Sequence, residues 1–280
     1  TPAPFLCYYI DMNHNLTVMK YCFPELSKEN QTPLEYTKTV LNMMREDGSI
    51  DYNGFLTEED FIKDISGRVE NISTAEYRVI TDEQRVTIDS LVEQACSASM
   101  AVLPHPDTPL FVFVFPWYPS DDDLKKFGGV TAVARHSRVM HLFVNANDFS
   151  SESLIDTVTH EFNHLVYYSL YGLGPFSLEE NMFMEGLAEV FKDEITKNAI
   201  SPWANALSDS ENSEVYKSLQ PRLKSQDQDF IKEVLFGSEN FKRWTGYSIG
   251  YWLAKKFREQ NVNSSWEGIM KNKKAHHSEE

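Results

Sequence analysis

The chain has 280 residues, of which 41% are apolar, and a formal net charge of −16 at pH 7. This length and apolar share suffice to bury a hydrophobic core, in one large domain or a two-lobed enzyme, and exclude wholesale disorder. The excess of acidic side chains repels phosphate backbones and anionic membrane surfaces. We therefore expect neither nucleic acid nor a membrane as a partner.

The cysteines and the N-terminus bear on the compartment. Three cysteines are too few and too scattered for a disulfide framework, although a single bridge stays open if the protein is exported. The chain begins with neither an initiator methionine nor a signal peptide. These features favour a cytoplasmic protein, with secretion as the alternative if a signal was removed.

The N-terminal part of the chain is expected to be mostly helical, with a helix over 82–100. Alternating phenylalanine and valine at 111–115 then predict a strand that is buried on both faces. The segments GGVTAVAR and RVMHLFVNA predict two more strands, joined by a turn near 135–138. Helical periodicity dominates the remainder of the chain.

This order of elements predicts an α+β fold and a division into two parts. A helical N-terminal region is expected over 1–105. The region 106–280 is expected to contain a small mixed sheet, a helix that carries a chemical motif, and a mostly helical C-terminal lobe. One continuous domain is the alternative.

The stretch HEFNH at 160–164 is that motif, and it lies in a helix predicted over 151–171. His160 and His164 are one helical turn apart, so both imidazoles point the same way and can bind one metal ion. Glu161 would lie beside the metal, where it can accept a proton from the attacking water. A helix surface with two unrelated histidines is the alternative, so a third ligand is required.

A second helix supplies that ligand. A third histidine six residues after His164 is not available, because Leu170 stands there. In SLEENMFMEGLAEVF, a capping box predicts the start of a helix, and Glu185 and Glu189 share one of its faces. We predict Glu185 as the third zinc ligand and Glu189 as the acceptor that holds a ligand histidine. A solvated acidic face is the alternative for both carboxylates.

These motifs, together with GYSIGYWLAKKF, resemble those of the gluzincin metallopeptidases, and more closely those of a bacterial family known as predicted zinc-dependent proteases. The resemblance extends over about 111–257. It implies a zincin-like fold, a zinc ion bound by His160, His164 and Glu185, and Glu161 as the general base.

Two weaker predictions concern the substrate. Tyr247, with Tyr251 as the alternative, could donate a hydrogen bond to the oxyanion of the reaction, although packing explains either tyrosine equally well. The segment GGVTAVAR could form an edge strand that pairs with an extended peptide. The competing interpretation is a strand with a flexible glycine entry.

A calcium-binding loop is a further hypothesis, at 49–60. Asp51 and Asn53 occupy ligand positions of an EF-hand loop, but Ser49 and Asp60 replace the aspartate and glutamate that such a loop prefers. An ordinary turn before a helix is the alternative.

The sequence therefore favours a zinc metallopeptidase of the HExxH gluzincin type that hydrolyses a peptide or protein substrate. The absence of an exopeptidase signature before the motif favours an endopeptidase. The alternative is a binding protein, either an inactive gluzincin fold or a calcium-responsive helical module.

Overall fold

The computed structural model describes most of the chain after residue 80 and two strands before it. The segment 49–60, for which a calcium-binding loop was one hypothesis and an ordinary turn the other, lies outside the described residues. The described residues are 7–12, 16–22, 35, 38, 42, 62, 80–105, 110–117, 127–145 and 148–272.

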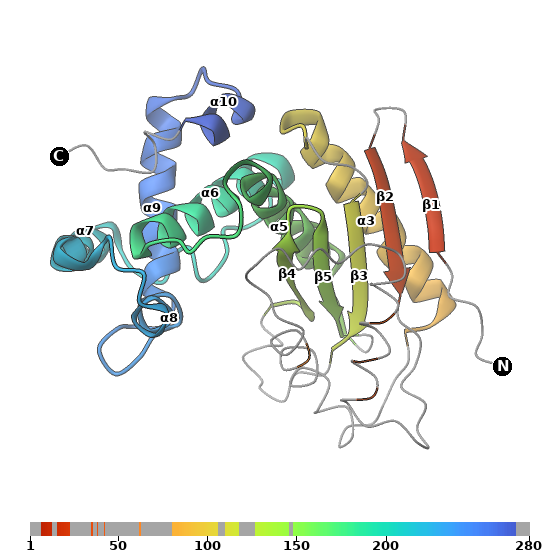
Figure 1. Cartoon of the computed structure of the whole chain (residues 1–280), viewed down its shortest axis with the longest axis horizontal. Helices are drawn as coiled ribbons and strands as arrows, with labels where there is room; N and C mark the ends of the chain where they lie inside the picture. Colours follow the sequence, from red (N-terminus) through yellow and green to blue (C-terminus); the bar gives the residue numbers. More distant parts are fainter. Residues whose placement is uncertain are drawn as a thin grey trace. The chain divides into compact units, whose positions relative to one another are not determined.

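A five-stranded mixed sheet has the order β1-β2-β3-β5-β4 (Figure 1). β1 pairs antiparallel with β2, and β4 pairs antiparallel with β5, whereas the two inner pairs, β2 with β3 and β3 with β5, are parallel. The predicted mixed sheet is confirmed, and β4 lies at one edge of it. The strand bounds are Cys7–Met12, Leu16–Cys22, Leu110–Pro116, Val130–His136 and Val139–Val144 for β1 to β5.

The expectation of a helical N-terminal region is wrong for β1 and β2. The β1 sequence contains Tyr8, Tyr9 and Ile10, and the β2 sequence contains Thr17 and Val18, residue types that favour strands. Each run is short. β1 pairs antiparallel with its neighbour β2, whereas β2 pairs parallel with β3, which lies much later in the chain. Because β2 is joined to the sheet through β3, a pairing far along the chain stabilises these strands, and local periodicity carries no sign of it.

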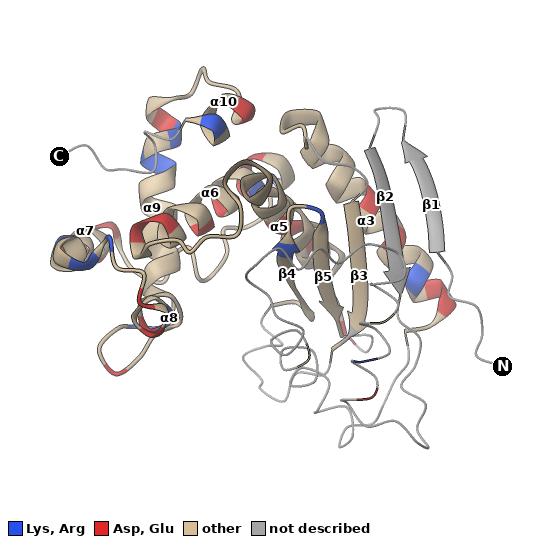
Figure 2. Ribbon diagram, in the orientation of Figure 1, with Lys and Arg blue, Asp and Glu red and all other residues tan. Residues whose placement is uncertain are grey.

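The middle of the sheet is apolar except for His141 of β5. All six described side chains of β3 and all six of β5 are buried, which confirms the strand that was predicted to be covered on both faces. Figure 2 shows β3 and β5 without Lys, Arg, Asp or Glu. Strands of this composition need cover on both faces, as parallel strands usually have.

Two helices confirm the sequence predictions closely. α3 spans Asp82–Val102 and buries one face, which includes Ile88, Val92 and Cys96. α5 spans Ser151–Tyr171, the bounds predicted from the sequence. It ends at Gly172, whose φ of 75° is a left-handed conformation that glycine adopts without steric cost.

The remainder of the described chain is helical. α6 begins with the predicted capping box, in which the Ser177 side chain accepts from the Glu180 amide and the Glu180 carboxylate accepts from the Ser177 amide. Side chains from α6 to α9 form one apolar cluster, which includes Met182, Val234 and Ile249. The elements are α6 Leu178–Thr196, α7 Asp209–Leu219, the 3-10 helix η2 Gln220–Arg222, α8 Gln228–Phe236, α9 Thr245–Gln260 and α10 Trp266–Lys271.

Glycines let α6 and α9 approach each other closely. A Cβ atom added to Gly186 would lie 2.0 Å from the Gly250 carbonyl oxygen, and one added to Gly250 would lie 1.9 Å from the Met182 carbonyl oxygen. The two helix backbones are therefore in contact at this crossing. Neither position tolerates a side chain without movement of a backbone.

The chain forms two compact units, Thr1–Ser97 with His105–Glu161, and Ala98–Pro104 with Phe162–Glu280. These boundaries differ from the division between residues 105 and 106 that the sequence suggested. That division remains a prediction. None of the helices in the described ranges combines the length and apolar character needed to cross a lipid bilayer.

Candidate metal centre

The HEFNH motif lies in the middle of α5. His160, Glu161 and His164 each offer a ligand atom, and these atoms lie within 4.8 Å of one another. His164 and Glu161 are buried, and His160 is half-buried. The helical spacing thus brings together the two predicted histidine ligands and the predicted base, whereas Glu185, the predicted third ligand, is not a member of this cluster.

The apolar stripe of α5 holds the motif in place. Leu154, Val158, Phe162 and Leu165 have no exposed surface. Since these side chains recur at helical spacing, they fix the rotation of the helix and with it the direction of the two histidines. Ligands on a packed helix are positioned before a metal binds.

Glu185 of α6 contacts His164. Its Oε2 atom lies 3.4 Å from Nε2 of His164, and the two side chains are 15% and 5% exposed. Two ligand atoms that are each about 2.1 Å from a tetrahedral zinc ion lie about 3.4 Å apart. The separation of these two atoms therefore fits a shared zinc ion, and the donor set of imidazole and carboxylate fits zinc as well.

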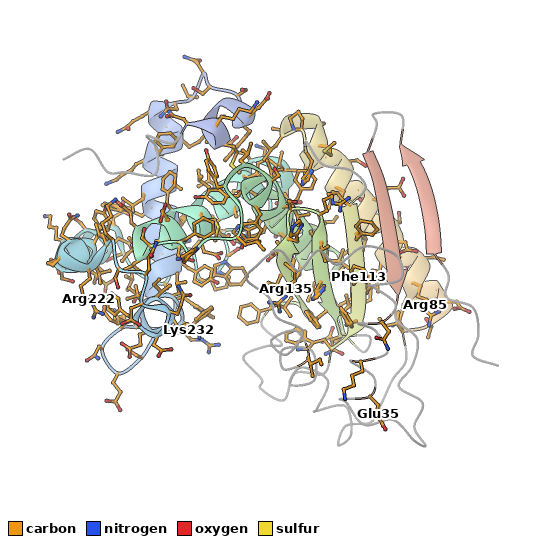
Figure 3. All side chains as sticks on the ribbon, viewed as in Figure 1. Glu35, Arg85, Phe113, Arg135, Arg222 and Lys232 are labelled. Atoms are coloured by element: carbon orange, nitrogen blue, oxygen red, sulfur yellow. The ribbon has the colours of Figure 1, made fainter. Side chains whose placement is uncertain are left out.

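The carboxylate of Glu161 is held by the sheet. Its Oε2 atom accepts a hydrogen bond of 2.6 Å from the backbone amide of Ala134 on the edge strand β4. Figure 3 labels Arg135, the next residue on this strand. Sequence reasoning did not find this contact, because a backbone donor leaves no signal in residue type.

Glu189 lies one turn after Glu185, in a buried polar cluster of α6. Its Oε2 accepts from Lys192 Nζ at 2.9 Å, and its Oε1 accepts from Trp203 Nε1 at 2.7 Å. Lys192 is also 2.9 Å from Oδ1 of Asp193 and donates to Ser201 Oγ at 2.6 Å. Glu189 is 1% exposed, so its charge depends on these donors.

The ammonium of Lys192 is stabilised in its charged form. Burial opposes that form, but the charges and hydrogen bonds of Glu189 and Asp193 outweigh burial and raise the pKa of Lys192. The sequence prediction for Glu189, that it holds a ligand histidine, overlooked Lys192 and Trp203. The i, i+3 spacing of Glu189 and Lys192 was the available signal.

The two tyrosines proposed for the oxyanion both lie on α9 and have different surroundings. Tyr247 is half-buried against the apolar cluster, with its ring centroid 5.9 Å from that of Phe236. Tyr251 donates from its hydroxyl to Oδ2 of Asp193 at 2.8 Å, and burial together with Asp193 raises its pKa. Packing explains the position of Tyr247, and a polar contact explains that of Tyr251.

An aromatic stack adjoins His164. The ring centroids of His164 and Tyr168 are 6.1 Å apart, and the two rings are nearly parallel. Tyr168 stacks in turn on Phe176, with 6.4 Å between the ring centroids. Tyr168 and Phe176 are half-buried. This stack restricts the imidazole plane of His164 and lines one side of it with apolar surface.

The site agrees with a comparison of the chain with known families. Residues 88–275 match a family described as predicted Zn-dependent protease (DUF2268). The chain belongs to this family. The matched region contains both helices that carry the candidate ligands, which accords with the resemblance seen in the motifs.

One curated relative also matches the chain. It is the uncharacterized protein YjfC of Bacillus subtilis (strain 168), which is 23% identical over 148 residues, 48% of this chain and 48% of the relative. The chain therefore spans about half the length of this curated relative. No solved structure matches the chain significantly.

Proposed function

We propose that the protein is a gluzincin-type zinc metallopeptidase, in which His160, His164 and Glu185 bind the ion. The observation that carries the proposal is the approach of Glu185 to Nε2 of His164, because it brings a carboxylate from a second helix to the HExxH motif. Membership of a family of predicted Zn-dependent proteases supports the same function. Two histidines and a glutamate form a three-ligand set that leaves a fourth position open.

In the proposed reaction, Glu161 acts as the general base beside the zinc ion. When bound, zinc would polarise a peptide carbonyl and lower the pKa of a water molecule to about 7. Glu161 accepts the proton of the attacking water and then delivers it to the leaving nitrogen. Its burial beside the sheet keeps competing water away from the carboxylate.

An extended peptide is the substrate that fits the edge strand. β4 lies at the edge of the sheet, where its outward backbone groups can pair with an added strand. Pairing through the main chain places few demands on side chains and suits an endopeptidase. Tyr247, with Tyr251 as the alternative, remains a proposed oxyanion donor.

The test is zinc content and peptide hydrolysis, measured on one set of variants. Wild type should hold about one zinc ion per chain and cleave casein, as expected of a three-ligand site. Glu185→Ala should lose most zinc and all activity. Glu161→Gln should keep zinc and lose activity, because it removes only the base. Glu233→Ala and Glu152→Gln, both at exposed positions, are the matched controls.

The outcomes separate the proposal from its alternative. Absence of zinc from wild type after reconstitution would overturn the metallopeptidase. Zinc bound without hydrolysis of casein or unfolded proteins would favour the inactive binding protein. Cell fractionation tests the expected cytoplasmic location.

A further inference from the structure

The hydrogen bond between Ala134 and Glu161 connects the sheet edge to the proposed general base. Its N···O distance is 2.6 Å, and both residues are buried, with Ala134 6% and Glu161 8% exposed. A donor bound to a carboxylate in a buried place forms one of the stronger hydrogen bonds in proteins. This contact therefore has the strength to fix the position of the Glu161 side chain.

The register of the sheet explains why this amide points away from β5. In an antiparallel pair, residues alternate between facing the partner strand and facing outward. The Asn145 amide donates to the Gly129 carbonyl, so Gly129 faces β5, and with it Thr131 and Val133. Val130, Ala132 and Ala134 consequently direct their backbone groups toward the outer edge.

The regular antiparallel pairing of β4 with β5 also ends at Ala134. A register shift lies between Ala134 and His136, which makes Ala134 the last residue of uninterrupted pairing. Irregularities of this kind commonly re-aim backbone and side chains next to active sites. The amide that meets Glu161 thus belongs to a rigid strand at the point where its pairing changes.

We propose that the backbone amide of Ala134 is a positioning group for Glu161, an inference that rests on the proposed function. The amide holds Oε2 and so leaves Oε1 for the attacking water. A free glutamate side chain has several rotatable bonds, and a fixed donor on a strand restricts them before substrate binds. A backbone amide keeps its proton near neutral pH and, unlike a side-chain donor, has no rotamers of its own.

The same geometry limits how a peptide can pair with β4. An added strand can use the outward groups of Val130 and Ala132, but the amide of Ala134 is already bound to Glu161. Regular pairing of the peptide therefore stops beside the base. This arrangement would place the scissile bond next to Glu161 by backbone register and without any side-chain pocket.

The contact itself can be tested without activity. Metal-free protein labelled with ¹⁵N-alanine gives amide signals for both Ala132 and Ala134, so Ala132 serves as an internal control on the same strand. In Glu161→Ala, the Ala134 amide proton should move upfield and exchange with solvent at least about 10-fold faster, since its acceptor is gone. The Ala132 signal should not change. An unchanged Ala134 signal would overturn the proposal.

The kinetic consequence requires removal of the amide alone. Replacement of Ala134 by lactic acid converts its N–H to an ester oxygen and keeps the methyl side chain. Misplacement of the base should lower kcat about 10-fold or more, with KM for a casein-derived peptide within about 2-fold and zinc content unchanged. The same replacement at Ala132 should instead raise KM, because that group would pair with substrate.

Failure of this proposal is distinguishable from failure of the proposed function. If wild type binds zinc and cleaves peptides but the ester at 134 keeps full kcat, the positioning role is overturned and the peptidase stands. If wild type is inactive, the amide signals still report whether Ala134 holds Glu161. Equal losses of kcat at 132 and 134 would indicate general damage to β4 and would also overturn a specific role for Ala134.

Discussion

Two carboxylates on α6, one helical turn apart, have opposite surroundings. Glu185 is 15% exposed at its side chain and faces Nε2 of His164. Glu189 is 1% exposed and accepts hydrogen bonds from Lys192 and Trp203. The same helical face thus presents one carboxylate to an imidazole and encloses the next among strong donors.

The difference shows that helical spacing sets the face on which a carboxylate lies, whereas tertiary contacts set its hydrogen-bond partners. Spacing puts Glu185 and Glu189 on one side of the helix. The cation and the indole determine that Glu189 belongs to a buried ion cluster, where its charge is compensated by the protein. Glu185 would depend on a metal ion for the same compensation. Substitutions in α6 and its neighbours test whether the two carboxylates differ in this way.

The largest effect is expected from Lys192→Met. Removal of the ammonium leaves the buried Glu189 and the half-buried Asp193 without their cation, which should lower the free energy of unfolding by about 3–5 kcal/mol. Urea denaturation of the metal-free protein measures this. Lys232→Met, at an exposed position labelled in Figure 3, is the control and should change little.

The pH dependence of Lys192 sharpens the same prediction. Because its pKa is raised in the folded state, its contribution is fully present below the ordinary value of 10.5 and is lost as pH rises through the higher folded-state value. Wild type should therefore lose stability above pH 10.5 more steeply than Lys192→Met. If the unfolding free energies of the two proteins fall equally with pH above 10.5, the buried ion cluster is contradicted.

A smaller effect is expected from Glu189→Gln on zinc affinity. If this carboxylate also steadies a ligand histidine, its loss should weaken zinc binding about 10–100-fold, measured by competition with a chelator. Glu194→Gln is a matched control, because Glu194 also lies on α6 and accepts from a cation and an indole, Arg258 and Trp266. Equal zinc affinity in both variants would limit Glu189 to the ion cluster.

Gly186→Ala tests whether the place of α6 matters to both carboxylates. The added methyl group would meet the Gly250 backbone, so α6 and α9 must separate, at a cost of about 1–3 kcal/mol in unfolding free energy. Thermal denaturation measures the loss. Gly172→Ala controls for the methyl group, since no atom lies within 4 Å of that position, although its positive φ adds strain of its own.

The smallest effect on stability is expected at Glu211, an exposed carboxylate. A hydrogen bond from Lys242, followed by those from the Ser208 amide and hydroxyl, lowers the pKa of Glu211 from 4.5 to about 2. The stability that it contributes is present above pH 4.5 and is lost as pH falls toward 2. Wild type should therefore lose more stability than Glu211→Gln between pH 4.5 and pH 2. Identical urea midpoints for both proteins across this window would refute the assignment.

The sequence predicted those parts of the molecule that depend on short-range pattern. The bounds of α5, the capping box at Ser177 and the buried strand β3 all follow from residues within one element. The placement of His160, Glu161 and His164 close together on one helix follows from helical spacing. These features could be read because hydrophobic period, capping chemistry and ligand spacing are local.

What the sequence left out depends on distant contacts. Among the described strands, β3 is the one that joins β1 and β2 to the rest of the sheet, so their local pattern was insufficient. The Ala134 amide holds Glu161 through backbone register, which residue type does not encode. Trp203 reaches Glu189 from a segment after the helix, and no spacing rule predicts that encounter.

The parallel register of β2 and β3 has a consequence for shortened versions of this protein. The family match begins at residue 88, after both N-terminal strands. A chain trimmed to the matched region would lack β1 and β2 and would leave the backbone of β3 open along one side. An open, apolar strand of this kind recruits other chains into aggregates. We therefore expect soluble expression of the matched region to require the N-terminal strands.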